Sequence, residues 1–149
     1  MGELQEEIRV ELRNLERLSK EMGQLLTKVG DELSFIEVRA AGSILHDFYC
    51  GVERILKRIA LSVDGNLPQG EEWHNELLLQ MARPVEGVRK AVIDDELLQK
   101  LKEYKRFRHL FRHIYGFELR WERFRGLCIA MSETLEKIEY NLRTFFNEN

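Results

Sequence analysis

A basic segment, Lys105–Arg125, contains the residues of this chain that are best suited to chemistry. It holds seven Lys or Arg residues, two His and two Glu, in a protein whose formal net charge is −3. The rest of the chain must therefore carry about −8, so positive charge is concentrated here. Arg108, His113 and Tyr115 form the pattern R-x4-H-x-Y. Arginine binds phosphate oxygens with parallel N–H groups and histidine exchanges protons near neutral pH, which favours a phosphodiester substrate, and RNA in particular.

The spacing of this pattern poses a geometric problem. On an ideal helix Arg108 and His113 lie about 140° apart, so one helix cannot easily aim both at the same phosphate. A local break near the helix end would solve this, and so would a second copy of the helix across a two-fold axis. Arg112 and Tyr115 fall on the same stripe as Arg108, and His109 falls between that stripe and His113.

The other basic side chains of the segment are candidates for binding RNA: Lys105, Arg106, His109 and Arg112. Aromatic residues are interleaved with them: Phe107, Phe111, Tyr115, Phe117 and Trp121. This mixture suits nucleic acid, because aromatic rings stack on bases while arginines contact phosphates. A solvated helix face without a binding role explains the charges equally well on spacing alone.

A metal centre is not expected. His109 and His113 are four residues apart, as a helical metal pair requires, but zinc needs at least a third protein ligand and the neighbouring arginines would repel a cation. Carboxylates that a metal-dependent nuclease would use are almost absent from the basic segment. We therefore expect no metal and no other cofactor.

Residues outside the basic segment offer weaker candidates. His46 and His74 stand alone in the sequence, and His74 has the position of a capping or packing histidine. Asp47 and Glu53 could be buried partners for an arginine, although exposure on a solvated flank is an equally good interpretation. Neither cysteine has a motif around it that would make it a nucleophile.

Composition limits the fold and the class of protein. The chain has 149 residues, 44% hydrophobic and 33% charged, with two Pro and ten Gly, which predicts one helical domain over residues 1–149. Its two cysteines are expected to be reduced and buried. The acidic, amphipathic N-terminus differs from a signal peptide, and no apolar run is long enough to cross a membrane. We expect a soluble cytoplasmic protein.

Apolar residues recur at helical spacing along most of the chain, which predicts an antiparallel bundle of about five helices. Gly30 and Asp31 are expected to end the first helix and cap the second, and Asp94 or Asp95 to cap the fourth. Gly116 is expected to end the fourth helix or break it. The predicted helices span residues 3–29, 31–63, 71–83, 95–115 and 118–146.

The pattern at Arg108, His113 and Tyr115 resembles the R-x4-H-x-Y motif of the HepT toxins, within the wider HEPN group of helical ribonucleases. The resemblance extends over most of the chain, through His46–Ala60, the Leu-Pro-x-Gly loop and Glu71–Met81. It implies a homodimer whose metal-independent ribonuclease site is formed at the interface by Arg108 and His113 of both chains.

The resemblance also implies partners. HepT-like proteins are toxins of type VII-like toxin–antitoxin pairs, and the antitoxin is an MntA-type nucleotidyltransferase that transfers AMP to the motif tyrosine, here Tyr115. The substrate is RNA, and tRNA in some members of the family. A non-catalytic helical module that binds a nucleotide or a nucleotidyltransferase through the same basic segment is the alternative.

Overall fold

The computed structural model describes residues 2–29 and 32–148, and every long element in this part of the chain is an α-helix. Six α-helices follow one another there: α1 (Gly2–Val29), α2 (Phe35–Ile59), α3 (Trp73–Ala82), α4 (Asp95–His113), α5 (Trp121–Ile129) and α6 (Met131–Glu148). Pairing of the β type is limited in these residues to an isolated bridge between Val85 and Arg89. The predicted all-α fold is confirmed. None of the described helices has the length and apolar character that crossing a membrane requires.

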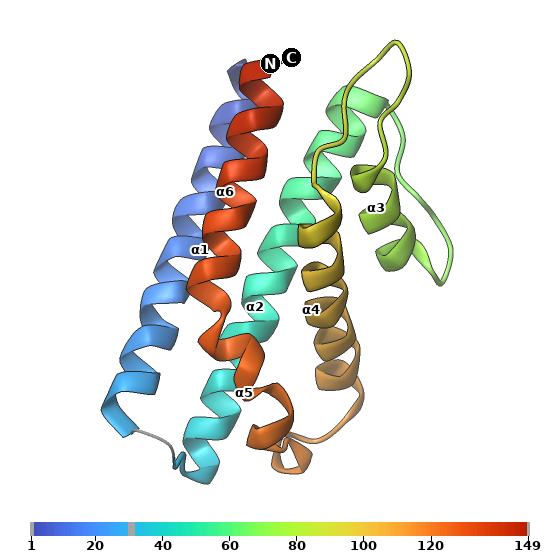
Figure 1. The fold of residues 1–149 in the computed structure, drawn as a ribbon. Coiled ribbons are helices and arrows are strands. Elements are labelled where there is room, and N and C mark those ends of the chain that lie inside the picture. The colour runs from blue at the N-terminus through green and yellow to red at the C-terminus, as the bar shows by residue number, and fades with distance from the viewer. Residues whose placement is uncertain (1, 30–31, 149) are drawn as a thin grey trace.

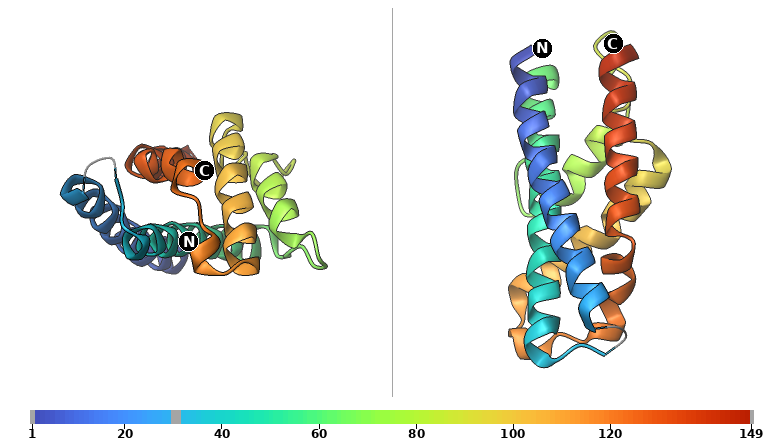
Figure 2. Two further views of the ribbon diagram at one scale, coloured as in Figure 1. Left: turned by 90° about the horizontal axis from the view of Figure 1, so that it is seen from below. Right: turned by 90° about the vertical axis from the view of Figure 1, so that its left-hand side faces the viewer.

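Helix α2 lies at the centre of the bundle, where it packs against α1, α3, α4 and α5. Figure 1 shows that α1 and α4 run in one direction while α2 and α6 run in the other. The view along the bundle in Figure 2 shows α3 outside α4, on the side away from α1. Because α2 faces several neighbours, its predicted apolar stripe is almost fully buried: Ala41, Leu45, Phe48, Val52, Ile55 and Ile59.

The start of α2 corrects one prediction. Gly30 and Asp31, the predicted helix end and cap, lie outside the described residues, and α2 begins only at Phe35. Ser34 is the N-cap: its hydroxyl accepts a hydrogen bond from the Glu37 amide, and the Glu37 carboxylate accepts one from the Ser34 amide. This capping box gives partners to two amides at the start of the helix, which explains the later start.

The start of α4 agrees with its prediction, whereas α3 is shorter than expected. The Asp94 carboxylate accepts a hydrogen bond of 2.8 Å from the Leu97 amide, so Asp94 is the cap. Helix α3 was predicted over residues 71–83 but is shorter at both ends. Glu72 makes no side-chain cap, and the backbone of Arg83 is already extended. Its first turn therefore begins at Trp73.

The single helix predicted over residues 118–146 is wrong. A 3₁₀ turn at Gly116–Glu118 precedes α5, and a bend at Ala130 separates α5 from α6 (Figure 1). Ala130 has a ψ of −1°, and its N–H donates to the carbonyls of both Gly126 and Cys128. The apolar spacing continues across this bend, so periodicity alone could not reveal it.

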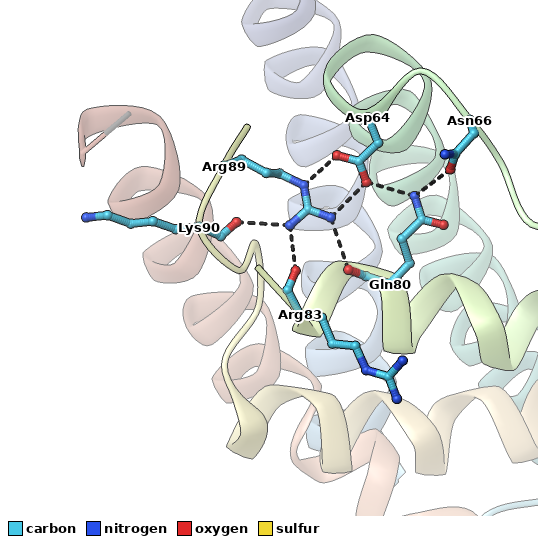
Figure 3. A network of polar contacts seen from close by, with 6 residues as sticks. All are labelled: Asp64, Asn66, Gln80, Arg83, Arg89 and Lys90. Atoms are coloured by element: carbon cyan, nitrogen blue, oxygen red, sulfur yellow. Dashed lines mark hydrogen bonds and ion pairs between the residues drawn. The ribbon is translucent and has the colours of Figure 1, made fainter. Parts of the chain in front are cut away.

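A buried arginine joins the connector after α3 to the π-helical turn Ala60–Asp64 that follows α2 (Figure 3). The Arg89 side chain is 1% exposed, and its guanidinium donates to both carboxylate oxygens of Asp64. It also donates to the backbone carbonyls of Gln80, Arg83 and Lys90. All its donor groups therefore have partners inside the protein, and the network holds the C-terminal end of α3 in place.

Two glycines in helices provide a test of the packing between α1 and α2. A Cβ atom at Gly51 would lie 2.6 Å from Cδ2 of the fully buried Leu15, whereas one at Gly23 would meet nothing within 4 Å. Gly51→Ala is expected to lower the free energy of unfolding by about 1–2 kcal/mol, because overpacking exceeds the gain in helix propensity. Gly23→Ala is expected to raise it by about 0.5–1 kcal/mol.

Urea denaturation of both variants measures these changes. Because the two substitutions are chemically identical, a gain in helix propensity alone would stabilise both. Stabilisation by Gly51→Ala would show that α1 and α2 are not in close contact at this position.

Candidate active site

The basic side chains of α4 occupy the part of its surface that the core leaves free. Leu101, Tyr104 and Phe107 form the buried face, and the Tyr104 hydroxyl donates to the carbonyl of Leu127 over 2.9 Å. This contact ties α4 to α5. The predicted binding residues Arg106, His109 and Arg112 are exposed with His113, while Lys105 and Arg108 are half-buried.

Helix α4 ends earlier than predicted, which changes the position of Tyr115. The last helical residue is His113, and Ile114 is already extended, with φ −129° and ψ 164°. Gly116 therefore does not mark the helix end. The sequence spacing placed Tyr115 on the same helical stripe as Arg108. This prediction is wrong, because Tyr115 lies beyond the end of the helix.

Arg108 faces a buried carboxylate on α2. Its Nε atom lies 3.4 Å from Oε1 of Glu53, whose side chain is only 7% exposed. The other carboxylate oxygen, Oε2, accepts a hydrogen bond of 2.6 Å from Nδ1 of His74 at the start of α3. Glu53 thus lies between an arginine and a histidine from two other helices. The prediction that Glu53 could be a buried partner of an arginine is confirmed. Asp47 is exposed instead.

His113 lies at the exposed end of α4. Its Nδ1 atom lies 2.7 Å from the carbonyl oxygen of His109, and the two imidazole rings stack with their centroids 4.2 Å apart. A carbonyl oxygen can only accept, so Nδ1 of His113 carries the proton and donates it. In the neutral ring Nε2 is then the nitrogen with a free lone pair, as a general base requires.

Tyr115 is held at the surface by its backbone rather than by its phenol. Tyr115 is 71% exposed, and its ring stacks on Phe117 at a centroid distance of 5.2 Å. The Tyr115 amide donates to Oε1 of Glu118 over 2.8 Å. Arg39 of α2 packs against the backbone of Gly116, because a Cβ there would lie 2.8 Å from the Arg39 Nε atom. The segment is thus fixed against α2 while its phenol remains open to solvent.

His46 has a packing role. Its ring stacks on Phe111 at 4.9 Å and lies 3.7 Å from the Cys50 sulfur. Burial lowers the pKa of His46, and Arg108 and Arg112 lower it further, while Asp47 opposes them. The lowered pKa disfavours the charged imidazolium form that would attract a phosphate.

The two cysteines are free thiols, as expected from their sequence context. Cys128 is buried as predicted, and burial raises its pKa to about 12, so it is not a reactive thiolate near neutral pH. Cys50 is only half-buried.

A pocket of about 460 Å³ opens between α3 and α4. Its lining combines cations, imidazoles, two carboxylates and an amide: Glu71, Glu72, His74, Asn75, Lys105, Arg106, Arg108 and His109. It therefore unites four of the predicted site residues. His113, Arg112 and Tyr115 do not line it, so within one protomer Arg108 and His113 do not share this pocket. No group of three or more His, Cys, Asp or Glu side chains in the described residues could hold a metal ion.

Sequence reasoning assigned no role to the contact between Glu53 and His74. The two residues are 21 positions apart, and only the packing of α3 beside α2 brings them together. A signal was present on α2, where His46, Cys50, Glu53 and Lys57 recur every three or four residues and form a stripe beside the buried apolar face of the helix. Lys57 of this stripe lies over the Trp73 ring, 4.1 Å from its centroid.

Comparison with known proteins places the chain in a family. A family model described as HepT-like protein matches residues 40–149, which include Glu53, His74 and the whole R-x4-H-x-Y pattern. Among characterised proteins and solved structures, nothing matches the chain.

Proposed function

Because this chain belongs to the HepT-like family, we propose that it is a ribonuclease toxin that cleaves RNA, with tRNA as its substrate, without a metal ion. One observation carries the proposal: Arg108, anchored by the buried Glu53, converges with Lys105 and His109 on one pocket of α4. A guanidinium fixed in this way can bind a phosphate with little loss of conformational entropy.

The chemistry needs only proton transfer and charge stabilisation, because RNA supplies its own nucleophile, the ribose 2′-OH. His113 removes the 2′-OH proton through Nε2, a role worth roughly 10²–10⁴-fold in rate. Arg108 binds the scissile phosphate and stabilises the charge that develops as the oxygen attacks. The RNA backbone is held by other basic residues in the C-terminal half of α4: Lys105, Arg106, His109 and Arg112. The first product is a 2′,3′-cyclic phosphate.

The proposed enzyme is a homodimer, in which Arg108 of one protomer and His113 of the other serve the same cleft. Exposed apolar side chains at the end of the bundle where α4 stops support this arrangement: Phe35, Ile36, Tyr115 and Phe117 are between 56% and 79% exposed. They belong to two segments that pack together, since Arg39 contacts Gly116. Large apolar side chains gathered on one surface are typical of an interface.

Incubation of the purified protein with total tRNA in excess EDTA tests the activity. Cleavage into fragments that end in a 2′,3′-cyclic phosphate supports the ribonuclease. Intact tRNA, together with a protein that still binds a nucleotide or its nucleotidyltransferase partner, would instead support a non-catalytic binding module.

The proposed partner is an MntA-type nucleotidyltransferase antitoxin, which neutralises the toxin by transferring AMP to the Tyr115 hydroxyl. The 71% exposure of this residue supports the assignment, because a second protein can reach the phenol without unfolding the segment around it. An AMP group on Tyr115 adds a bulky anion beside the arginines of α4, where it competes with RNA phosphates.

Tyr115→Phe is expected to abolish the AMP mass gain that the wild type acquires when it is co-expressed with the nucleotidyltransferase. The physical reason is that phenylalanine preserves the stacking on Phe117 but has no oxygen to accept the group. Intact-mass spectrometry measures the result. Tyr140→Phe is a matched control, because Tyr140 is 61% exposed but lies on α6. A mass gain on Tyr115→Phe equal to that of the wild type would disprove the site.

A further inference from the structure

The pocket between α3 and α4 holds a histidine that the proposed mechanism does not use. His74 lines this pocket together with Arg108. Its Nδ1 atom lies 2.6 Å from Oε2 of Glu53, and its side chain is 23% exposed. Glu53 is buried and contacts Arg108 through its other oxygen. One carboxylate therefore positions both a cation and an imidazole at the same pocket.

This arrangement determines which atom of His74 can act on a ligand. The Glu53 carboxylate accepts the hydrogen bond, so Nδ1 of His74 carries a proton and Nε2 is the nitrogen left for a bound molecule. The same hydrogen bond fixes the orientation of the ring, so Nε2 is the one ring nitrogen of His74 that can exchange a proton with a molecule in the pocket. His74 and His113 therefore each present Nε2 for proton transfer, and the role of base is already assigned to His113.

We propose that His74 is a further catalytic residue, the general acid that protonates the leaving oxygen during RNA cleavage, and that Glu53 is its positioning residue. This inference rests on the proposed ribonuclease activity. His113 Nε2 takes the 2′-OH proton, the O2′–P bond forms, the P–O5′ bond breaks, and His74 Nε2–H gives its proton to O5′. The products are a 2′,3′-cyclic phosphate and a 5′-hydroxyl, and exchange with water restores both imidazoles.

The other two histidines fit this role less well. His46 is stacked on Phe111 and does not line the pocket. His109 lines the pocket, but its described contacts are the ring stacking with His113 and the hydrogen bond that its carbonyl accepts. Neither has a buried carboxylate that fixes a ring nitrogen. Lys105 and Asn75 line the pocket with His74, and Lys105 Nζ lies 3.5 Å from Asn75 Oδ1.

A substrate with a modified leaving group tests the assignment. The wild type is first used to map a cleavage site in tRNA, and two short RNAs are made around it. One has a normal 5′-oxygen at the cleaved bond, and the other has a bridging 5′-sulfur, whose thiolate leaves without protonation. His74→Gln is expected to cleave the oxygen substrate about 10²–10⁴-fold more slowly than the wild type, and the sulfur substrate within about tenfold of it.

Several controls accompany this comparison. His113→Gln is expected to slow both substrates, because a base is needed in either case. His46→Gln is the matched control and should retain activity on both. Glu53→Gln keeps a hydrogen-bond acceptor but removes the charge, and is expected to show only a partial rescue by sulfur, because Glu53 also contacts Arg108, which both substrates need. Thermal unfolding of each variant verifies that it is folded.

The outcomes separate this inference from the proposed function. If the wild type cleaves RNA and His74→Gln slows the cleavage of both substrates equally, or of neither, His74 is not the general acid. The proposed ribonuclease activity would then still hold. If the wild type cleaves no RNA at all, the ribonuclease and the role of His74 are both wrong. Selective loss on the oxygen substrate with rescue by sulfur is the expected result.

Discussion

Replacing Arg108 by alanine is expected to lower the rate constant for RNA cleavage by about 10²–10³-fold, because the variant loses the cation that stabilises charge on the phosphate in the transition state. The guanidinium is pre-positioned, since its side chain is 15% exposed and faces the Glu53 carboxylate. Single-turnover cleavage of tRNA in EDTA measures the change in the chemical step directly.

Controls distinguish this effect from a general loss of charge or of folding. Arg143→Ala removes an exposed arginine of α6, outside the pocket between α3 and α4, and should leave the rate unchanged. Arg108→Lys keeps the charge but not the fork of parallel N–H groups, so intermediate activity is expected. A folded Arg108→Ala protein that cleaves as fast as the wild type would exclude Arg108 from catalysis.

Replacing Arg89 by methionine is expected to lower the free energy of unfolding by about 3–5 kcal/mol, because it leaves the Asp64 carboxylate buried without its cation. The Arg89 and Asp64 side chains are 1% and 4% exposed, so solvent screens their interaction little. Three backbone carbonyls in Figure 3 lose their donor at the same time. Chemical denaturation at pH 7 measures the loss.

A second substitution shows how much of this loss comes from the unpaired charge. The double variant Arg89→Met with Asp64→Asn removes the uncompensated carboxylate, so it should be more stable than Arg89→Met alone. A loss of less than about 1 kcal/mol in Arg89→Met would mean that the buried pair contributes no more than an exposed one.

The same network has a defined dependence on pH. Burial alone would raise the pKa of Asp64, but hydrogen bonds from Arg89 and Gln80 and the charge of Arg89 reverse this effect and lower it. A carboxyl whose pKa is lowered by folding stabilises the protein above its unfolded value of about 4 and loses that contribution as the pH falls through the folded value. Stability from this pair is therefore fully present at pH 7.

The network also matters for the candidate active site. It fixes the C-terminal end of α3 against Asp64, and His74 lies in the first turn of the same short helix. Since α3 contains only ten residues, its position depends on contacts at both ends. Loss of Arg89 should therefore weaken the pairing of His74 with Glu53 as well as global stability.

Local features of the sequence were sufficient to predict most of the helices and the place of the candidate chemistry. Apolar spacing depends only on neighbouring residues, so it identified α1, α2 and α4 and the buried stripe of α2. The Asp94 cap was predictable for the same reason, because a carboxylate can bind the amide three residues later without help from the rest of the fold. The R-x4-H-x-Y pattern indicated the family that residues 40–149 match.

Long-range packing determined the rest. The bend at Ala130 and the end of α4 at His113 leave the apolar spacing intact, so no local pattern marks them. Glu53, His74 and Arg108 come from three helices, and their convergence depends on how α3 and α4 pack beside α2. The spacing of residues along the chain determines on which face of a helix a side chain lies. Which side chains it meets there depends on how that helix packs against helices that are distant in the sequence.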